Sequence, residues 1–455
     1  MIDLEIFKIS EKSTISDALL QIEKNTKGFT LVLNGQDCVI GIVTDGDIRR
    51  KLLEGIQLDA SISHCSNVDF VKADVDTPRE LLLKQLDHKI KVIPVLDEQQ
   101  RLITIVSKDH LPEMAEQKVY SRAKSPVRIS FGGGGSDTST YFTENGGAVI
   151  NATISLYSHA TLKLRDDAKI SIFSIDLQDI VHFENIKELL NFPSKFALIQ
   201  SLIKAIKPTF GFELFIHSDF PMNSGLGGSA VVTSAILGCF NQFRQDKWDK
   251  YELSEIAFQA ERLYLGVAGG WQDQYATVFG GLNFMEFNSN QNIINPIRLN
   301  KEILLELEES LVLCYTGTTH DSGNIHDDQK KQTQNSNIKD QIQSNVALTY
   351  EMRNHLLRGR LNEFGKCLHK TWELKKSFSS KISSPWLDDI YNGAMENGAI
   401  GGKLLGAGGG GYFLFYVPSF NRHKIMNWIK AKGLYYTPFI FEEHGLQSWT
   451  VRENE

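Results

Sequence analysis

The sequence has few cysteines, little charge imbalance and no long apolar run. Its five cysteines lie far apart and form no CxxC pair, which favours neither a disulfide framework nor a zinc site and suits a reducing cytoplasm. The formal net charge of −7 argues against binding to nucleic acid or to an anionic membrane. The longest uncharged run, 220–243, contains proline, asparagine and four glycines, so it does not predict a membrane span.

The N-terminal residues lack the basic-then-apolar pattern of a secretory signal, so we expect a cytoplasmic protein. A length of 455 residues is too great for one core and suggests about three structural units. The proportions of 42% apolar and 23% charged residues are typical of a globular protein. The polar stretch 316–337 is rich in Gln, Asn, Asp and Thr, and it predicts a surface loop or lid.

Residues 1–111 contain a weak internal repeat. The segments STISDALLQI, FTLVLN, CVIGIVT and DGDIRRKLLEG predict a helix, two strands and a helix. The same order recurs in DTPRELLLKQL, KVIPVLDE, RLITIVS and KDHLPEMA. Two such copies are expected to pair and bury one shared sheet face. The charged stretch that follows predicts a linker over 116–125.

The stretch GIVTDGDI at 41–48 resembles the second strand and turn of a CBS (cystathionine-β-synthase) domain, so the repeat is similar to a CBS pair. The resemblance implies one copy at 1–57 and a second at 58–115. CBS pairs commonly associate with one another, so it also implies a homodimer.

In CBS domains a Gly-x-x-Thr-x-x-Asp pattern holds the ribose and phosphate of adenine nucleotides. The resemblance carries this role to Thr44 and Asp47, with Gly41 opening the pattern. The second copy keeps a hydroxyl at Ser107 but has His110 in place of the aspartate. An adenine nucleotide is therefore expected in the first copy.

Three glycine clusters follow, SFGGGGSD at 130–137, SGLGGSA at 224–230 and LGAGGGG at 405–411. None fits the pattern GxxxxGK[ST], which removes the P-loop interpretation. Two match the dinucleotide fingerprint in their letters, but a strand pattern follows the last cluster. The middle cluster lacks a strand-end acidic residue some twenty positions later, so a dinucleotide fold is disfavoured for both.

The middle cluster lies between a predicted strand at 212–220 and a predicted helix. Backbone N–H groups at such a helix start can face an anion, and glycine lets phosphate oxygens approach the backbone closely. The alternative is an ordinary helix start that Ser224 or Ser229 caps.

Taken together, the clusters resemble the three motifs of the GHMP kinases (galacto-, homoserine, mevalonate and phosphomevalonate kinases). The matching stretches are SPVRISFGGGGSD, PMNSGLGGSA and GGKLLGAGGGGYFLFY, in the order of the family. The resemblance implies an α+β fold in which the CBS pair precedes a two-lobed kinase, with a ribosomal-S5-like lobe at 126–300 and a ferredoxin-like lobe at 301–455. It also implies ATP and Mg²⁺ as cofactors.

Within that family, GGWQDQYATVFGGLN at 269–283 resembles the group that phosphorylates D-glycero-D-manno-heptose 7-phosphate. This implies ATP-dependent phosphorylation of the anomeric hydroxyl, which makes the 1,7-bisphosphate for nucleotide-activated heptose and surface polysaccharide. The small-molecule partner would be a sugar phosphate.

The family motifs imply roles for individual residues. Asp273 matches the catalytic aspartate, although an aspartate there could instead cap a helix. Ser229 and Glu261 match the magnesium ligands, and Glu261 could equally lie on a solvated helix face. The nucleotide-binding residues implied by the central motif are Pro221, Ser224, Gly225, Leu226, Gly227, Gly228, Ser229 and Ala230.

For the sugar, the resemblance implies Arg128, Gly134 and Asp137 from the first motif. A phosphate already on the sugar also needs cations. The candidates are lysines near the last glycine cluster, each of which could instead be a solvated surface charge. With the glycines of that cluster, the set is Lys375, Lys376, Lys381, Lys403, Gly408 and Gly409.

Two positions depart from the expected pattern. Gly228 stands where the family has a serine, and His320 stands where we expect an arginine. Two alternatives therefore remain: a kinase for the anomeric hydroxyl of another sugar such as L-fucose, or a weakly active nucleotide sensor. A further hypothesis is that adenine nucleotide at the CBS pair regulates the kinase.

Overall fold

A computed structural model describes residues 3–86, 90–107, 110, 119–192, 195–318 and 336–452. The chain divides into two compact units, Met1–Gln117 and Lys118–Glu455. Within the described ranges, none of the helices has both the length and the apolar character that crossing a membrane requires.

The first unit contains two small sheets of the same design. In each, two strands pair in parallel and a third is antiparallel, in the orders β1-β2-β3 and β4-β5-β6. The elements are η1 (Leu4–Phe7), β1 (Lys8–Ser10), α1 (Ile15–Asn25), β2 (Phe29–Leu33), β3 (Val39–Thr44), α2 (Asp45–Leu53), η2 (Ile62–His64), β4 (Ala73–Asp74), α3 (Arg79–Gln85), β5 (Val92–Leu96) and β6 (Leu102–Ser107).

The two sheets share one core, as the repeat predicts. Leu31 of β2 and Ile105 of β6 belong to the same buried apolar cluster. Both sheets also shift register at the same place, between Val32 and Leu33 in one and between Val95 and Leu96 in the other. The internal repeat is therefore a structural repeat, although its last helix was predicted on residues that, except His110, lie outside the described ones.

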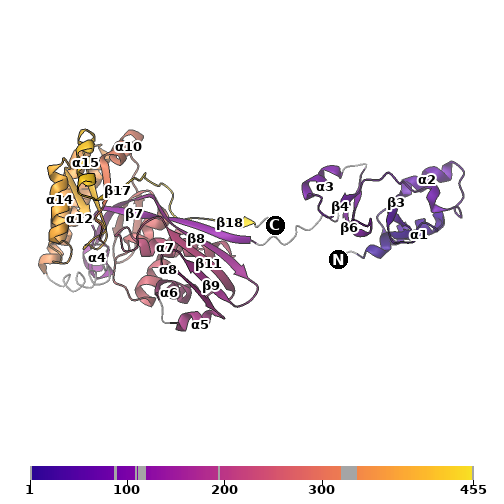
Figure 1. Cartoon of the computed structure of the whole chain (residues 1–455), viewed down its shortest axis with the longest axis horizontal. Coiled ribbons are helices and arrows are strands. Elements are labelled where there is room, and N and C mark those ends of the chain that lie inside the picture. The colour runs from indigo at the N-terminus through magenta and orange to yellow at the C-terminus, as the bar shows by residue number, and fades with distance from the viewer. Residues whose placement is uncertain are drawn as a thin grey trace. The chain divides into compact units, whose positions relative to one another are not determined.

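The second unit begins with a lobe built on an eight-stranded sheet (Figure 1). Its path is β10-β9-β11-β8-β12-β13, with β7 paired to β8 and to the C-terminal strand β18. The elements are β7 (Val119–Gly132), α4 (Ser139–Asn145), β8 (Gly147–Arg165), β9 (Ile170–Ser174), β10 (Asp179–Phe183), α5 (Ile186–Asn191), α6 (Ala197–Ile206), β11 (Gly211–Ser218), α7 (Gly228–Gln242), α8 (Lys250–Gln259), η3 (Ala260–Tyr264), α9 (Gln272–Phe279), β12 (Leu282–Phe287), β13 (Asn292–Pro296) and β18 (Gln447–Arg452).

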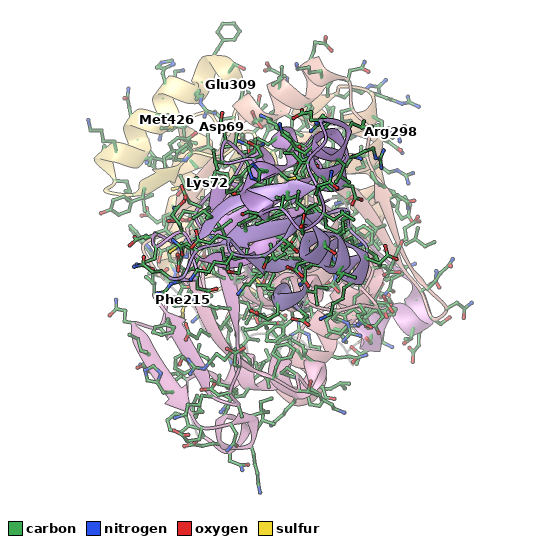
Figure 2. All side chains as sticks on the ribbon, turned by 90° about the vertical axis from the view of Figure 1, so that its right-hand side faces the viewer. Asp69, Lys72, Phe215, Arg298, Glu309 and Met426 are labelled. Atoms are coloured by element: carbon green, nitrogen blue, oxygen red, sulfur yellow. The ribbon has the colours of Figure 1, made fainter. Side chains whose placement is uncertain are left out.

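At β11, one face of this sheet is covered and the other is partly exposed. Leu214 and Ile216 of β11 are buried in a cluster that includes residues of α6 and α7. Phe215, which is labelled in Figure 2, lies on the other face and is 42% exposed. Its ring stacks on that of Phe173, with ring centroids 4.3 Å apart. This alternation is the period-two pattern of a half-buried strand.

The second lobe is a four-stranded antiparallel sheet, β15-β16-β14-β17, with helices packed on it (Figure 1). Its elements are α10 (Lys301–Ser310), β14 (Leu311–Tyr315), α12 (Ser336–Leu357), α13 (Leu361–Lys376), α14 (Pro385–Glu396), β15 (Gly401–Leu404), β16 (Tyr412–Tyr416), η4 (Ser419–Asn421), α15 (Arg422–Ala431) and β17 (Tyr435–Thr437). A single apolar cluster joins the lobes, since Val127 of β7 and Leu414 of β16 both belong to it with Met352 of α12. The predicted two-lobed α+β architecture is confirmed.

The predicted boundaries differ from the structure at two places. Residues 119–125, expected in a linker, form the start of β7, where Ser121 and Ala123 are buried while Arg122 is exposed. The outward charges of this half-buried strand explain the error. The second lobe also ends before the predicted 455, because Trp449 of β18 pairs with Arg122 in the first lobe.

Candidate active site

The middle glycine cluster connects β11 to α7, as predicted. Gly225 and Gly227 have φ of +81° and +79°, and Gly227 is the N-cap of α7 without any side-chain cap bond. The alternative of a serine-capped helix is therefore wrong. The Ser224 hydroxyl beside the loop is buried and has no hydrogen-bond partner. A helix N-terminus with an unsatisfied buried hydroxyl beside it fits the phosphates of a nucleotide.

The last glycine cluster packs against the backbone of this loop. A Cβ on Gly406 would lie 2.5 Å from Gly225 Cα, and one on Gly411 would lie 2.3 Å from Ser224 O. The Tyr412 backbone N–H also donates to Ser224 O at 3.2 Å. The glycines are required here because two backbones meet, a reason that the sequence does not reveal.

Gly408 and Gly409, which the resemblance assigns to the substrate, pack instead against a neighbouring loop. The Gly409 N–H donates to Ile382 O at 2.8 Å, and a Cβ on Gly408 would lie 2.9 Å from Ile382 Cα. Of this cluster, Gly406 and Ala407 line the cavities of the kinase unit. Gly408 and Gly409 are not among the described residues that line those two cavities.

Asp273 is bound on both carboxylate oxygens by Arg128. Arg128 Nε donates to Oδ1 at 2.8 Å and Nη2 donates to Oδ2 at 2.9 Å, while Nη1 donates to Gly225 O at 2.8 Å. The guanidinium is almost fully buried, which strengthens this forked pair. Arg128, expected at the sugar, thus fixes the Asp273 carboxylate relative to the glycine loop at 224–230, called the phosphate loop below. The helix-capping alternative for Asp273 is wrong, since α9 has no side-chain cap bond.

Glu261 is also buried rather than solvated. It lies in the π-helical turn η3 with 3% exposure, and accepts from Gln274 Nε2 at 3.0 Å and from the Ser229 side chain. Burial raises the pKa of Glu261 despite the nearby Arg262 guanidinium. A desolvated carboxylate beside a hydroxyl is a set of hard oxygen donors that fits Mg²⁺.

Two cavities meet beside the Asp273 carboxylate. The larger, of about 440 Å³, is lined by the phosphate loop, Glu261 and apolar residues such as Phe196 and Ile199. The smaller is lined by polar and charged side chains that include Asp137. Four residues line both cavities: Arg128, Arg262, Asp273 and Gly406. A nucleotide in one cavity and an acceptor in the other would therefore meet beside Asp273.

Asp137 occupies the wall of the smaller cavity. Its carboxylate accepts from the backbone N–H of Gly135 at 3.1 Å and of Gln272 at 3.2 Å. Burial and the charge of Asp273 raise the pKa of Asp137. A Cβ on Gly270 would lie 1.9 Å from Asp137 Oδ2, which explains the glycine there. The carboxylate is held in place to accept from a hydroxyl.

The structure divides the predicted lysine set. Lys375 and Lys403 line the smaller cavity. Lys375 Nζ donates to Leu404 O at 3.1 Å and to Gly406 O, and burial together with Arg128 lowers the pKa of Lys375 to about 7. Burial and Lys375 hold the pKa of Lys403 well below its ordinary value. Lys376 instead pairs with Glu373 at 2.8 Å, and Lys381 is exposed.

Several cavity residues were not predicted. Asn345 of α12 is 2% exposed, and its Nδ2 donates to Gly134 O at 3.2 Å while its Oδ1 has no partner. Thr371, Arg262 and Gln272 also line the smaller cavity. Arg262 adjoins the predicted Glu261, and Gln272 lies within the stretch 269–283 that resembles the heptose kinases. No sequence motif marks Asn345 or Thr371, whose helices only the tertiary fold brings to the cavity.

At Gly228 the Phe220 ring lies close to the position of a side chain. A Cβ there would lie 3.0 Å from Phe220 Cε2. The missing serine is thus matched by an aromatic ring that lines the larger cavity. The second departure, His320, lies outside the described residues, as does most of the predicted lid.

In the first unit, Thr44 and Asp47 bond to each other. The Asp47 N–H donates to Thr44 Oγ1 at 3.2 Å and the Thr44 N–H donates to Asp47 Oδ2 at 2.9 Å, so they form a capping box on α2. In the second copy, Ser107 and His110 are joined through their backbones. The predicted nucleotide residues therefore have a local structural role, which leaves their binding role a prediction.

The fold and the site define a two-lobed small-molecule kinase. Family models for the GHMP kinases N terminal domain and the GHMP kinases C terminal match residues 195–281 and 352–422, and a CBS domain model matches 2–54. The chain is 34% identical over 336 residues to the D-glycero-alpha-D-manno-heptose 7-phosphate kinase of Campylobacter jejuni, covering 72% of this chain and 99% of that one. The chain belongs to the GHMP kinase family and is a sugar kinase with an N-terminal CBS domain.

Two further comparisons agree. A solved D-glycero-D-manno-heptose 1-phosphate kinase from Bacteroides thetaiotaomicron is 28% identical with a TM-score of 0.61, covering 73% of this chain and all of that one. The L-fucokinase/L-fucose-1-P guanylyltransferase of Bacteroides fragilis is 30% identical over 66% of this chain and 34% of its own length. The expectation of an ATP-using sugar kinase is confirmed.

Proposed function

We propose that this kinase transfers the γ-phosphoryl group of ATP to the anomeric hydroxyl of D-glycero-D-manno-heptose 7-phosphate, giving the 1,7-bisphosphate. The observation that carries the proposal is the smaller cavity, where Lys375, Lys403 and Arg128 lie beside a hydroxyl-accepting carboxylate. Arg128 already pairs with Asp273, so the two buried lysines share the cavity with one further carboxylate, Asp137. A sugar phosphate supplies the additional negative charge that a neutral sugar lacks. The similarity to a heptose 7-phosphate kinase supports the same substrate.

Asp273 is positioned to orient the accepting hydroxyl and take its proton. The new P–O bond forms at the anomeric oxygen as the bond to the β-phosphate oxygen breaks, and ADP leaves. Arg128 keeps both Asp273 oxygens fixed through its two N–H···O bonds. Asp137, held by two backbone N–H groups, accepts from a second sugar hydroxyl.

Ser229 and Glu261 would hold Mg²⁺, which supplies charge neutralisation for the phosphates when bound. The raised pKa of buried Glu261 makes its carboxylate depend on a nearby cation. The positive end of α7 and the N–H groups of the loop bind the phosphate chain from the other side.

The adjacent lysines provide a matched test. We expect Lys375→Met to raise the KM for heptose 7-phosphate by about tenfold or more, because a charged hydrogen bond to the phosphate is lost. Lys376→Met should leave it unchanged, because that ammonium pairs with Glu373. Lys375 also donates to two backbone carbonyls, so its replacement removes structural bonds as well as a cation. Lys403→Met is therefore the second variant. An unchanged KM in both cavity variants rejects the phosphosugar and favours a neutral sugar such as L-fucose.

Asp273→Asn separates a kinase from a nucleotide sensor. We expect kcat to fall by about 10²-fold to 10⁴-fold because the proton acceptor is lost, while ATP binding measured by calorimetry is retained. ATP consumption by the wild-type chain with a panel of sugars and sugar phosphates, and product analysis at the anomeric carbon, completes the test. Nucleotide binding with no turnover of any sugar contradicts the kinase proposal.

We also propose that adenine nucleotide binds the CBS unit at Asp47 and regulates the kinase, and that the protein is a homodimer. The chain offers a matched control, because Thr14 and Asp17 form the same capping box on α1. Asp47→Asn should abolish the response of activity to AMP or ADP, whereas Asp17→Asn should lose a cap of similar strength and keep the response. Light scattering with and without AMP measures the oligomeric state. A response that survives Asp47→Asn rejects this site.

A further inference from the structure

A cluster of three different metal-binding side chains lies on the helices α12 and α13, and none of the three lines either of the two cavities. It consists of Glu351, His355 and Cys367, and their carboxylate, imidazole and thiol donor atoms all lie within 4.8 Å of one another. Glu351 and His355 are one helical turn apart on α12, so both side chains lie on the same face of that helix. Cys367 comes from the facing helix α13.

The surroundings of the cluster are those of a cation site at the edge of a core. Cys367 is 3% exposed and belongs to the apolar cluster that joins the lobes. His355 is half-buried and Glu351 is exposed, so the donors pass from the protein interior to solvent and leave an entry path. In the described part of the chain, no hydrogen bond or ion pair occupies any of these three side chains.

We infer that Glu351, His355 and Cys367 bind one Zn²⁺ or a chemically similar divalent cation. Thiolate, imidazole and carboxylate are the three ligand types that Zn²⁺ uses, and a fourth tetrahedral position remains for water. Two donors on one tetrahedral Zn²⁺ lie about 3.3–3.8 Å apart, so the three donors must approach one another from separations of up to 4.8 Å, and the exposed Glu351 side chain can rotate to do so. On binding, the Cys367 thiol loses its proton to solvent as the sulfur–zinc bond forms.

A cation here would tie together the two helices that carry part of the smaller cavity. Asn345 lies on α12, and Thr371 and Lys375 lie on α13. The helices are connected by residues 358–360 near the cluster. Bound Zn²⁺ would therefore stabilise this helix pair without touching the residues that act on the sugar.

The test uses Co²⁺ as a spectroscopic probe for Zn²⁺, added alone to the full-length chain without nucleotide. We expect one equivalent to bind with a thiolate-to-cobalt absorption band, which one equivalent of Zn²⁺ removes. Cys367→Ser should abolish the band. Cys38→Ser, at a more accessible cysteine, should retain it, and so should Asp273→Asn in the kinase site. Absence of the band in wild type, or its survival in Cys367→Ser, overturns the inference.

Because Cys367 is buried, its replacement could itself unfold the chain. His355→Ala and Glu351→Gln lie on the solvent side and give an independent measurement. Each should weaken Co²⁺ binding by more than about tenfold and reduce the Zn²⁺-dependent rise in Tm. Equal affinity in wild type and both variants contradicts the site. None of these readouts requires kinase activity, so a wrong sugar assignment leaves this result unaffected.

Discussion

At the scale of single residues, the two cavities depend on polar groups that are buried before any ligand binds. Arg128 and Asp273 satisfy each other through two hydrogen bonds. Asn345 Oδ1 and Ser224 Oγ, by contrast, are buried without partners. Such atoms cost free energy in the unbound protein, and a ligand that supplies a matching hydrogen-bond partner recovers it. We therefore expect the sugar substrate to donate to Asn345 Oδ1 and the nucleotide phosphates to accept from the Ser224 hydroxyl.

Asn345→Ala tests one of these atoms. We expect the KM for the sugar substrate to rise about threefold to tenfold, which corresponds to one neutral hydrogen bond, while the KM for ATP stays constant. Ser344→Ala is the control, since its exposed hydroxyl bonds within the helix to Asp340 O. Steady-state kinetics with each substrate varied decides the result. Equal changes in both KM values would mean that the substitution disturbs the fold instead.

Lys375 predicts a pH dependence of stability. Its pKa is about 7 in the folded chain and ordinary, near 10.4, in the unfolded chain. The unfolded state therefore binds more protons between these values, and this group makes stability rise with pH from about 7 to about 10. Below pH 7 the free-energy cost of burying the charged Lys375 ammonium is fully present.

Urea unfolding of the full chain at pH 7 and pH 9 measures this effect. We expect the free energy of unfolding of wild type, relative to Lys375→Met, to be larger at pH 9 than at pH 7. Lys376→Met is the matched control, because its ammonium pairs with Glu373 and does not line the cavity. A pH-independent difference for Lys375→Met would contradict the assignment.

At the scale of elements, function depends on the contact between two glycine loops from opposite lobes. Gly406 has φ +70°, and a Cβ on it would meet Gly225 Cα at 2.5 Å. The loop that faces the nucleotide cavity thus takes its shape from a loop about 180 residues later in the chain. The two clusters act as one structural unit.

Gly406→Ala should lower the free energy of unfolding by more than Gly433→Ala. Both glycines have positive φ, at +70° and +71°, but Gly433 has no atom within 4 Å of the added Cβ. The cost of placing alanine at a positive φ is the same at both positions and cancels in the comparison. The additional loss of about 1–3 kcal/mol in the free energy of unfolding at Gly406 then measures the cost of pushing the two loops apart. Thermal and urea unfolding measure it, and ATP affinity should fall in parallel. Equal destabilisation would show that the loops separate at no cost.

At the scale of the whole molecule, the chain returns at its end to the lobe where the second unit begins. β18 pairs with β7 over Gln447–Arg452 and Val119–Lys124. The Gln242 side chain of α7 also bonds to Ser448. The last strand therefore closes an edge of the first-lobe sheet and contacts the helix that begins at the phosphate loop.

Ending the chain after residue 446 should destabilise the kinase unit. The truncation leaves the N–H and C=O groups of one β7 edge unpaired, and an open strand edge favours aggregation. We expect a lower Tm of the kinase unit, measured by calorimetry, and a greater tendency to aggregate in light scattering. Removal of only 453–455, beyond the paired residues, is the control. A Tm equal to that of the control would show that β18 is dispensable.

The sequence predicted much of this arrangement because several of its patterns are local. The period-two and helical patterns identified the repeat in the first unit, and the glycine loop appeared between a strand and a helix. Local patterns misled where a strand has one charged face, as over 119–125 of β7. They could not separate Lys375 from Lys376, which differ only in the direction that α13 gives each side chain.

The sequence alone determined the family and the order of the domains, because each motif that carries them is made of residues close together in the chain, and it predicted Asp273 as the catalytic carboxylate. Only the tertiary structure decided which charges meet. It paired Arg128 with Asp273, buried Glu261, and brought Asn345 and Lys403 to one cavity, since those contacts join segments far apart in sequence. The same folding placed Cys367 against Glu351 and His355, although the scattered cysteines gave no indication of a metal site.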